Sequence, residues 1–233
     1  MILLSKRLRM NASLVTEGYR LADVGTDHGY IPIALVQEEK IPSALAMDVN
    51  PGPLWRAQQH IQEYGLDSLI HTRLSDGVKN LQPAEADSVL IAGMGGALIV
   101  KILEEGKEVL SSVKELILQP QSEIDKVRHY LEQAGYVIVK EDMVLEEGKY
   151  YPVMKAELGK MQYDREIFYQ YGKLLLEQQH PVMKAFLLFK LENCEKILQK
   201  LVRDGKQEER LKNRVQELEY EKSLILEALE FYE

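Results

Sequence analysis

Several side chains that could do chemistry stand close together in RLADVGTDHGYIPIALV, residues 20–36. An apolar run ends at Gly25, and Asp27, His28 and Gly29 follow before the helical spacing of apolar residues resumes. In an open α/β sheet, ligands bind beyond the carboxyl end of such a strand, at its turn into a helix. The segment therefore predicts a ligand site in which an aspartate and a histidine face the bound molecule.

The charge of this turn indicates which ligand it binds. Asp23 and Asp27 would repel a pyrophosphate at close range, and the segment has neither G-x-G-x-x-G nor G-K-[ST]. S-adenosylmethionine carries an ammonium and a sulfonium beside one carboxylate, so an acidic turn favours it over NAD. The alternative to a binding site is a tight structural turn in which Asp27 is only a local cap.

The ends of the next strand-like runs agree with this ligand. The second run ends in AMDVN, and its Asp48 stands where a carboxylate can accept hydrogen bonds from two ribose hydroxyls. Asp76 in LSDG could meet the exocyclic amine of the cofactor's adenine, or simply form an Asp-Gly turn. The fourth run ends in IAGMGG, residues 91–96, and lacks the prolines and aromatic residue typical of enzymes that methylate exocyclic amines. A ring nitrogen therefore remains a candidate methyl acceptor, and a small-residue helix start is the alternative reading of IAGMGG.

The elements that must hold these residues alternate along the chain. Strand-like runs and helical stretches follow one another after a first helix at 3–17, which predicts a mostly parallel sheet with helices on both faces. The strand-like runs lie at 20–25, 43–49, 69–75, 87–93 and 115–120, and the helical stretches at 31–39, 53–64, 95–109 and 122–134. Two further runs, 136–145 and 149–158, flank Gly148 and predict an antiparallel hairpin that closes the sheet.

The last third of the chain has helical periodicity. Pro181 is expected in the first turn of a long helix, and two apolar stripes flank the segment RDGKQ at 203–207. This pattern predicts an antiparallel α-helical hairpin, or coiled coil, whose tip is basic.

Composition limits the class of protein. No apolar run approaches the 18 or so residues of a membrane span, and the single cysteine, Cys194, excludes an internal disulfide and a Cys-rich zinc site. We expect a soluble, cytoplasmic protein without a membrane partner and without a metal. The net charge of −8 speaks against nucleic acid, but basic residues cluster in 1–20 and 196–214, and phosphate binding depends on local patches. Solvated helix faces are the alternative reading of both clusters.

Taken in order, seven short motifs resemble those of the bacterial tRNA (adenine-N1)-methyltransferases that modify adenine 22, the TrmK family. One position departs from the pattern, since Gln121 stands where an asparagine is expected. The motifs are LSKRL at 4–8, LADVGTDHGYIPIAL at 21–35, AMDVNPGPL at 46–54, SDG at 75–77, AGMGG at 92–96, LQPQ at 118–121 and EGKYYPV at 147–153.

The resemblance implies a Rossmann-like class I methyltransferase sheet, S-adenosylmethionine as donor, and the D-arm side of tRNA as substrate. We expect a methyltransferase domain over residues 1–160 and a helical coiled-coil domain over 161–233. The donor would meet the adenine at Asp27, His28, Tyr30 and Met94. The cofactor would be bound by Asp23, Gly25, Asp48, Asn50, Asp76 and Gly77, to which we add Thr26, Gly29, Val49 and Gly93.

The expected mechanism is direct attack of adenine N1, with the base unstacked and turned into the pocket. Tyr30 could stack on the base, Asp27 could hold its amino group, and His28 could pair with the base or orient Asp27. Packing at the helix start and a structural turn are the alternatives for Tyr30 and His28. The other histidines, His60 among them, receive no role.

For tRNA capture, the sequence predicts one basic group near the pocket and a second at the hairpin tip. A monomer is favoured, although the hairpin could instead serve dimerisation. A small-molecule methyltransferase, a methyltransferase of another RNA and a non-catalytic binding protein stay open as alternatives. The two groups are Lys6, Arg7 and Arg9 near the pocket, and Arg203, Lys206 and Arg210 at the tip.

Overall fold

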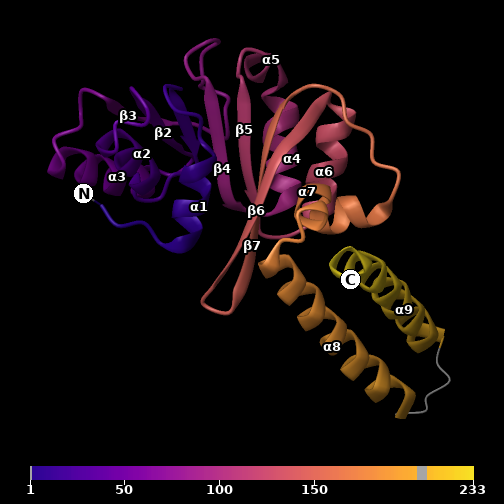
Figure 1. Ribbon diagram of the computed structural model, residues 1–233. Coiled ribbons are helices and arrows are strands. Elements are labelled where there is room, and N and C mark those ends of the chain that lie inside the picture. Colours follow the sequence, from indigo (N-terminus) through magenta and orange to yellow (C-terminus); the bar gives the residue numbers. More distant parts are fainter. Residues whose placement is uncertain (1, 204–208) are drawn as a thin grey trace. The chain divides into compact units, whose positions relative to one another are not determined.

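The structure is a computed structural model that describes residues 2–203 and 209–233. It divides into two compact units, Met1–Gln162 and Tyr163–Glu233. Figure 1 shows the sheet and its helices in the first unit and two long helices in the second. Within the described residues, no helix is both long enough and apolar enough to cross a membrane.

In the described part of the first unit, seven strands form one sheet in the order β3-β2-β1-β4-β5-β7-β6. The pairs from β3 to β5 are parallel, whereas β7 runs antiparallel to β5 and β6 antiparallel to β7. The predicted parallel sheet with a closing hairpin is therefore confirmed. The strands are β1 Leu21–Val24, β2 Ala44–Asp48, β3 Ile70–Leu74, β4 Ser88–Met94, β5 Glu115–Pro120, β6 Tyr136–Glu146 and β7 Lys149–Leu158.

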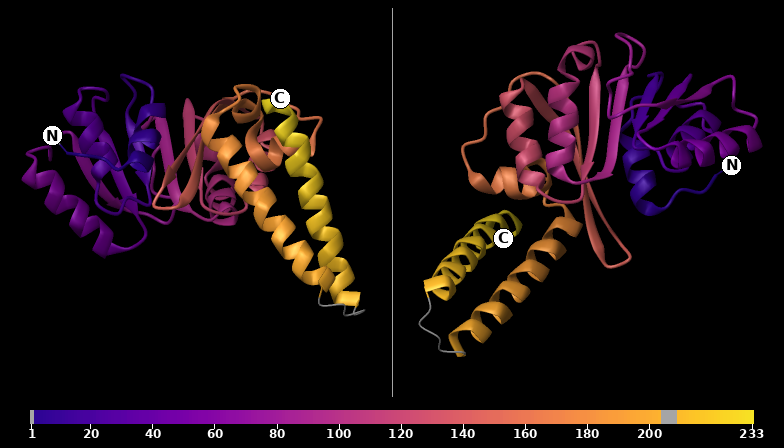
Figure 2. Two further views of the ribbon diagram at one scale, coloured as in Figure 1. Left: turned by 60° about the horizontal axis from the view of Figure 1, so that its bottom comes forward. Right: turned by 180° about the vertical axis from the view of Figure 1, so that it is seen from behind.

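Helices cover both faces of this sheet. Figures 1 and 2 show α4 and α6 on the face opposite to α1. The predicted helix at 95–109 is wrong in one respect, because it is interrupted at Gly106, where a Cβ would lie 2.1 Å from the Val78 side chain. The helices are α1 Lys6–Leu14, α2 Tyr30–Gln37, α3 Pro51–Glu63, α4 Gly96–Glu105, α5 Lys107–Leu110 and α6 Ile124–Gln133.

The strand order reverses between β1 and β4. From β1 the chain moves outward to β2 and β3, then returns to the other side of β1 as β4 and continues to β5. Asp23 pairs in register with Leu90, and Val24 with Ile91, so the turn after β1 lies beside the end of β4. A reversal of this kind opens a crevice outside the carboxyl ends of the two strands.

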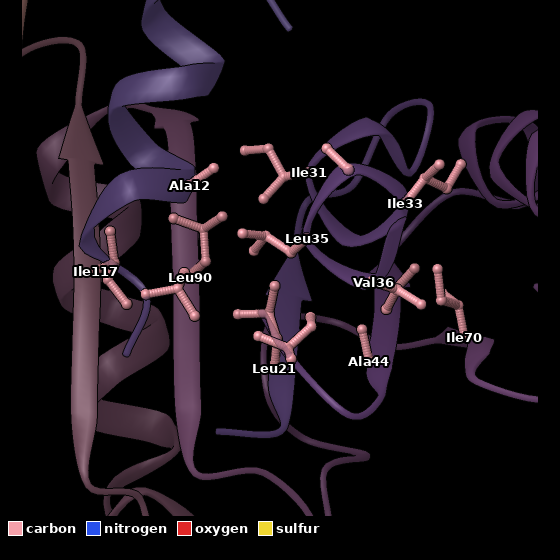
Figure 3. Packing of buried hydrophobic residues seen from close by; sticks show 14 of the residues in the cluster. Ala12, Leu21, Ile31, Ile33, Leu35, Val36, Ala44, Ile70, Leu90 and Ile117 are labelled. Carbon is pink, nitrogen blue, oxygen red and sulfur yellow. The ribbon is translucent and has the colours of Figure 1, made fainter. Parts of the chain in front are cut away.

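A hydrophobic core packs β1, α1 and α2 together. Figure 3 shows Ala12 of α1, Leu21 of β1, Ile31 of α2 and Leu90 of β4 among the packed side chains, all with at most 4% of their surface exposed. Full burial of one such leucine or isoleucine contributes roughly 1.5–3 kcal/mol. The two elements that flank the turn are thus anchored by the same cluster.

The second unit contains the helical hairpin that the sequence predicts. Helix α8 begins at Pro181, and Leu187 of α8 and Ile225 of α9 are fully buried. Charged pairs also join the two helices, with the Lys222 ammonium 2.7 Å from the Glu195 carboxylate. The elements are η1 Phe168–Gly172, α7 Lys173–Glu177, α8 Pro181–Arg203, α9 Glu209–Leu229 and η2 Glu230–Tyr232.

Candidate active site at the carboxyl ends of β1 and β4

A cavity of about 370 Å³ lies at the crevice where the strand order reverses. Its wall combines α1, the turn between β1 and α2, the end of β4 and the residue after β5. The lining residues are Arg7, Leu8, Asn11, Asp23, Gly25, Thr26, Asp27, His28, Gly29, Tyr30, Ile31, Ala92, Gly93 and Gln121.

Two glycines give the turn its shape. Gly25 has φ +80°, a conformation that disfavours a Cβ, and a Cβ there would lie 2.2 Å from Cε of Met94. Gly29 has φ +69° and precedes the first residue of α2, with the Ala57 side chain of α3 close behind it. The N–H groups of Gly25 and Thr26 both donate to the carbonyl oxygen of Met47, at 2.8 and 3.0 Å. The turn is therefore held by hydrogen bonds to β2 and by packing against α3.

Asp23 places a buried carboxyl at the floor of the cavity. Burial raises its pKa to about 6, the negative charge of Asp48 acts in the same direction, and the Thr26 hydroxyl opposes both. Among the described residues, no cationic side chain forms an ion pair with Asp23. A buried carboxyl with a pKa of about 6 is a suitable partner for a cationic ligand group, because the cation favours the ionised form of the carboxyl.

Asp27 and His28 lie nearer to the solvent. The Asp27 carboxylate is 62% exposed, and one of its oxygens is 3.1 Å from Nε2 of His28. Its other oxygen pairs with the guanidinium of Arg56, a residue of α3. A cation and an imidazole thus orient this carboxylate at the edge of the cavity.

Three rings cluster beside this carboxylate. His28 and Tyr30 stack with centroids 4.9 Å apart and planes at 14°, and His60 of α3 lies 5.5 and 5.1 Å from them. Nδ1 of His60 is 3.0 Å from the carbonyl oxygen of His28. A carbonyl can only accept, so His60 donates through a protonated Nδ1. His28 stacks on one face of Tyr30, so a base cannot stack on that face.

Helix α1 supplies the wall opposite to the turn. Asn11 is fully buried, and neither atom of its side-chain amide has a hydrogen-bond partner within the described residues. The Arg7 guanidinium lies over the Tyr151 ring, 5.0 Å from its centroid, and within 4 Å of the position of a Cβ on Gly93. Of the arginines and lysines that the structure describes, Arg7 alone lines the cavity.

The structure brings about half of the predicted site residues to the cavity. Those that line it are Asp23, Gly25, Thr26, Asp27, His28, Gly29, Tyr30, Gly93 and Arg7. Those that do not line it are Met94, Asp48, Val49, Asn50, Asp76, Gly77, Lys6 and Arg9. Met94 nevertheless packs against the turn through its contact with Gly25.

The predicted residues outside the cavity have other surroundings. The Asp48 carboxylate accepts a hydrogen bond of 2.7 Å from the N–H of Asn50 at the end of β2. Asp76 lies after β3 and pairs with Lys79, which lowers the pKa of this exposed carboxyl. Asp48 ends β2 and Asp76 follows the end of the parallel strand β3, so both lie along the same edge of the sheet as the cavity.

The predicted basic residues divide in a similar way. Lys6 is exposed, whereas Arg9 is paired with Glu38. At the hairpin tip, Lys206 and the side chains of Arg203 and Arg210 lie outside the described residues.

Sequence reasoning missed three site residues, Asn11, Arg56 and His60. A partial signal was present, because residues four apart on a helix share a face and Arg56 and His60 have this spacing in α3. Asn11 is a polar residue within a stretch of α1 that is otherwise buried and apolar. Neither pattern indicates by itself which element the side chains face.

The polar side chains that line the cavity fit a ligand that carries both positive charge and a carboxylate. Among the described residues, these include the buried Asp23, the exposed Asp27, one arginine, and Asn11, whose amide has no partner there. No group of three or more histidine, cysteine, aspartate or glutamate side chains in the described ranges is arranged to hold a metal ion.

Comparisons with known proteins agree on one class. Residues 4–154 match a family model described as a methyltransferase domain. The tRNA (adenine(22)-N(1))-methyltransferase of Bacillus subtilis is 40% identical over 166 residues, which are 71% of this chain and 68% of that protein.

Solved structures extend the similarity to almost the whole chain. The crystal structure of B. subtilis TrmK, an M1A22 tRNA methyltransferase, has a TM-score of 0.88 at 32% identity and covers 98% of this chain and 100% of its own. Streptococcus pneumoniae Sp1610, in complex with S-adenosyl-L-methionine, has a TM-score of 0.87 at 35% identity and covers 97% of this chain and 100% of its own.

Proposed function

The chain belongs to the bacterial tRNA (adenine-N1)-methyltransferases that modify adenine 22, the TrmK family, and on this basis we propose how its cavity serves the reaction. It is a methyltransferase that uses S-adenosylmethionine to methylate N1 of an adenine in tRNA. The single observation that carries this function is the acidic turn after β1, which lines a cavity at the point where the strand order reverses.

The residues of the sheet edge suit the cofactor along its length. Asp23 at the floor favours the positively charged end, and the more distant Asp48 and Asp76 are suited to the ribose hydroxyls and the adenine of the cofactor. When bound, S-adenosylmethionine supplies a methyl group on a sulfonium, and the in-plane lone pair of adenine N1 can accept it without prior deprotonation.

The protein therefore has to position the base and the cofactor and stabilise the transition state, and it does not have to remove a proton. Asp27, held by Arg56 and His28, presents carboxylate oxygens that can accept hydrogen bonds from the amino group of the target base. Tyr30 lines the cavity and offers an aromatic ring on which the base can stack. His28, with Nε2 directed to Asp27, serves to orient that carboxylate.

The target atom lies on the Watson–Crick edge, so the base has to leave its stack to reach the cavity. Arg7 lies at the cavity beside Gly93, where its guanidinium can bind a phosphate or the nucleotide next to the flipped base. We assign Lys6 to the same surface. The hairpin tip is proposed as a second binding site for the tRNA, through Arg203, Lys206 and Arg210.

The setting of the reaction follows from the substrate. Since tRNA is the substrate, we place the enzyme in the cytoplasm. We further propose that it acts as a monomer and without a metal ion.

Methyl transfer from labelled S-adenosylmethionine to an unmodified tRNA transcript tests this function. A paired transcript that carries guanine in place of adenine at position 22 is the control. Label in the first transcript and none in the second is expected. Equal labelling of both transcripts would contradict the site, and labelling of neither would contradict the substrate.

A further inference from the structure

The side chain of Asn11 is buried in the wall of the cavity and has no hydrogen-bond partner among the residues that the structure describes. It has 0% exposed surface, and both its Oδ1 and its Nδ2 lack a hydrogen bond within the described residues. A buried amide that stays unpaired costs free energy, and most buried polar groups in native proteins are paired. Because Asn11 lines the cavity, a molecule bound there can supply the partners of this amide.

Two molecules enter this cavity in the proposed reaction, the cofactor and the target base. The base arrives from solvent and must meet the exposed edge, where Asp27 lies. Asn11 has no exposure and lines the cavity together with Asp23, whose carboxyl is also buried. Asp48 and Asp76, suited to the adenosine end of the cofactor, do not line this cavity. The deep part near Asn11 and Asp23 is therefore left for the other end of the cofactor.

We propose that Asn11 binds the amino-acid end of S-adenosylmethionine, an inference that rests on the proposed function. Its Oδ1 accepts a hydrogen bond from the ammonium, and its Nδ2 donates one to the carboxylate. A carboxamide matches this pair of groups because its acceptor and donor stand side by side, as the ammonium and carboxylate do. Asp23 completes the arrangement as the counter-charge of the ammonium.

The proposal is tested by binding measurements on the full chain with two probes. S-adenosylhomocysteine has the amino-acid end, whereas 5′-methylthioadenosine keeps the adenosine and the thioether but lacks that end. Asn11→Leu should weaken binding of S-adenosylhomocysteine about 10- to 100-fold, as for a lost hydrogen bond to a charged group. Binding of 5′-methylthioadenosine should change less than about twofold.

Ser13→Ala is the matched control, since Ser13 is an exposed residue of the same helix and does not line the cavity. It should leave both affinities unchanged. Equal weakening of both probes by Asn11→Leu would mean that Asn11 shapes the whole pocket, and would overturn the proposal. Unchanged affinity for S-adenosylhomocysteine would also overturn it, and a raised KM for tRNA in that case would assign Asn11 to the base.

A second variant keeps the test independent of folding defects. Asn11→Asp retains the acceptor for the ammonium but sets a negative charge against the cofactor's carboxylate. It should bind S-adenosylhomocysteine more weakly than the wild type, and decarboxylated S-adenosylmethionine at least as well. The reverse preference would reject the assignment. If the wild type bound neither S-adenosylhomocysteine nor S-adenosylmethionine, the proposed function would fail, which is distinguishable from a failure at Asn11.

Discussion

Nδ1 of His60 lies 3.0 Å from the carbonyl oxygen of His28, although the two residues are 32 positions apart. The helix that follows β2 thereby holds the turn that follows β1. Arg56, one helical turn earlier, reaches the Asp27 carboxylate of the same turn. Residues 27 and 28 are thus positioned from outside their own segment.

His60→Ala should lower kcat about tenfold while the affinity for S-adenosylhomocysteine changes less than about twofold, because the variant frees the His28 carbonyl without touching Asp23. Steady-state kinetics and calorimetry measure the two quantities. His71→Ala, at an exposed histidine of β3, is the control and should behave as wild type. His60→Gln, which keeps a donor, should recover part of kcat. An unchanged kcat in His60→Ala would refute the positioning role.

Asp27→Asn should lower kcat/KM for tRNA about 100-fold, since the amide is a weaker acceptor for the amino group of the base and loses its attraction to Arg56. Single-turnover methyl transfer separates this loss from product release. Asp67→Asn is the control, because Asp67 is an exposed carboxylate that binds Gln58 and does not line the cavity. Similar losses in the two variants would contradict a specific role of Asp27.

Gly25→Ala should abolish measurable cofactor binding, because its Cβ would lie 2.2 Å from Met94 in addition to the strain of a positive φ. Gly18 is a matched control, since it has φ +79° but open space around a Cβ. Gly18→Ala should lower the free energy of unfolding by about 1 kcal/mol and leave binding intact. If both variants bound the cofactor equally well, the close approach of Met94 would be irrelevant. Thermal unfolding and calorimetry report the two effects.

The affinity for S-adenosylhomocysteine should rise with pH through the pKa of Asp23, which burial raises to about 6. Only the ionised carboxylate attracts the ligand's ammonium, so affinity at pH 5 should be about a tenth of its value well above pH 6. Asp23→Asn should remove this dependence. A wild-type affinity that is constant from pH 5 to pH 8 would contradict the pairing.

In the protein without ligand, rising pH should lower stability through the carboxyl of Asp23, whereas it raises the affinity for the ligand. Its pKa is higher in the folded chain than the ordinary 3.8, so the folded state binds more protons between about pH 4 and pH 6, and the free energy of unfolding falls as pH rises through this window. Asp23→Asn should therefore be more stable than the wild type at pH 7, as measured by denaturant unfolding.

Arg7→Ala should weaken tRNA binding and reduce the slope of log affinity against log salt by about one phosphate contact. Arg9→Ala should have the smaller effect, because Arg9 is already paired with Glu38 and does not line the cavity. Filter binding at several salt concentrations measures both slopes. A larger effect for Arg9 than for Arg7 would contradict this assignment.

Local sequence was sufficient for much of the fold. Apolar runs of strand length, separated by helical periodicity, predict the succession of β1 to β5 along the chain and the closing hairpin. Gly25 and Gly29 predict the tight turn, because few other residues accept a positive φ there. The break at Gly106 escaped prediction, and a Cβ at this position would collide with the side chain of Val78, which is distant in the sequence.

The sequence by itself determined the turn after β1, its acidic character and the family resemblance, because these depend on residues that are neighbours along the chain. Only the tertiary structure decided that Arg56 and His60 hold this turn and that Asn11 lines the cavity with an amide that is unpaired within the described residues. The physical reason is that α1, α3 and the turn meet through the packing of a shared sheet. The order of its strands is set by long-range pairing, which no local pattern encodes.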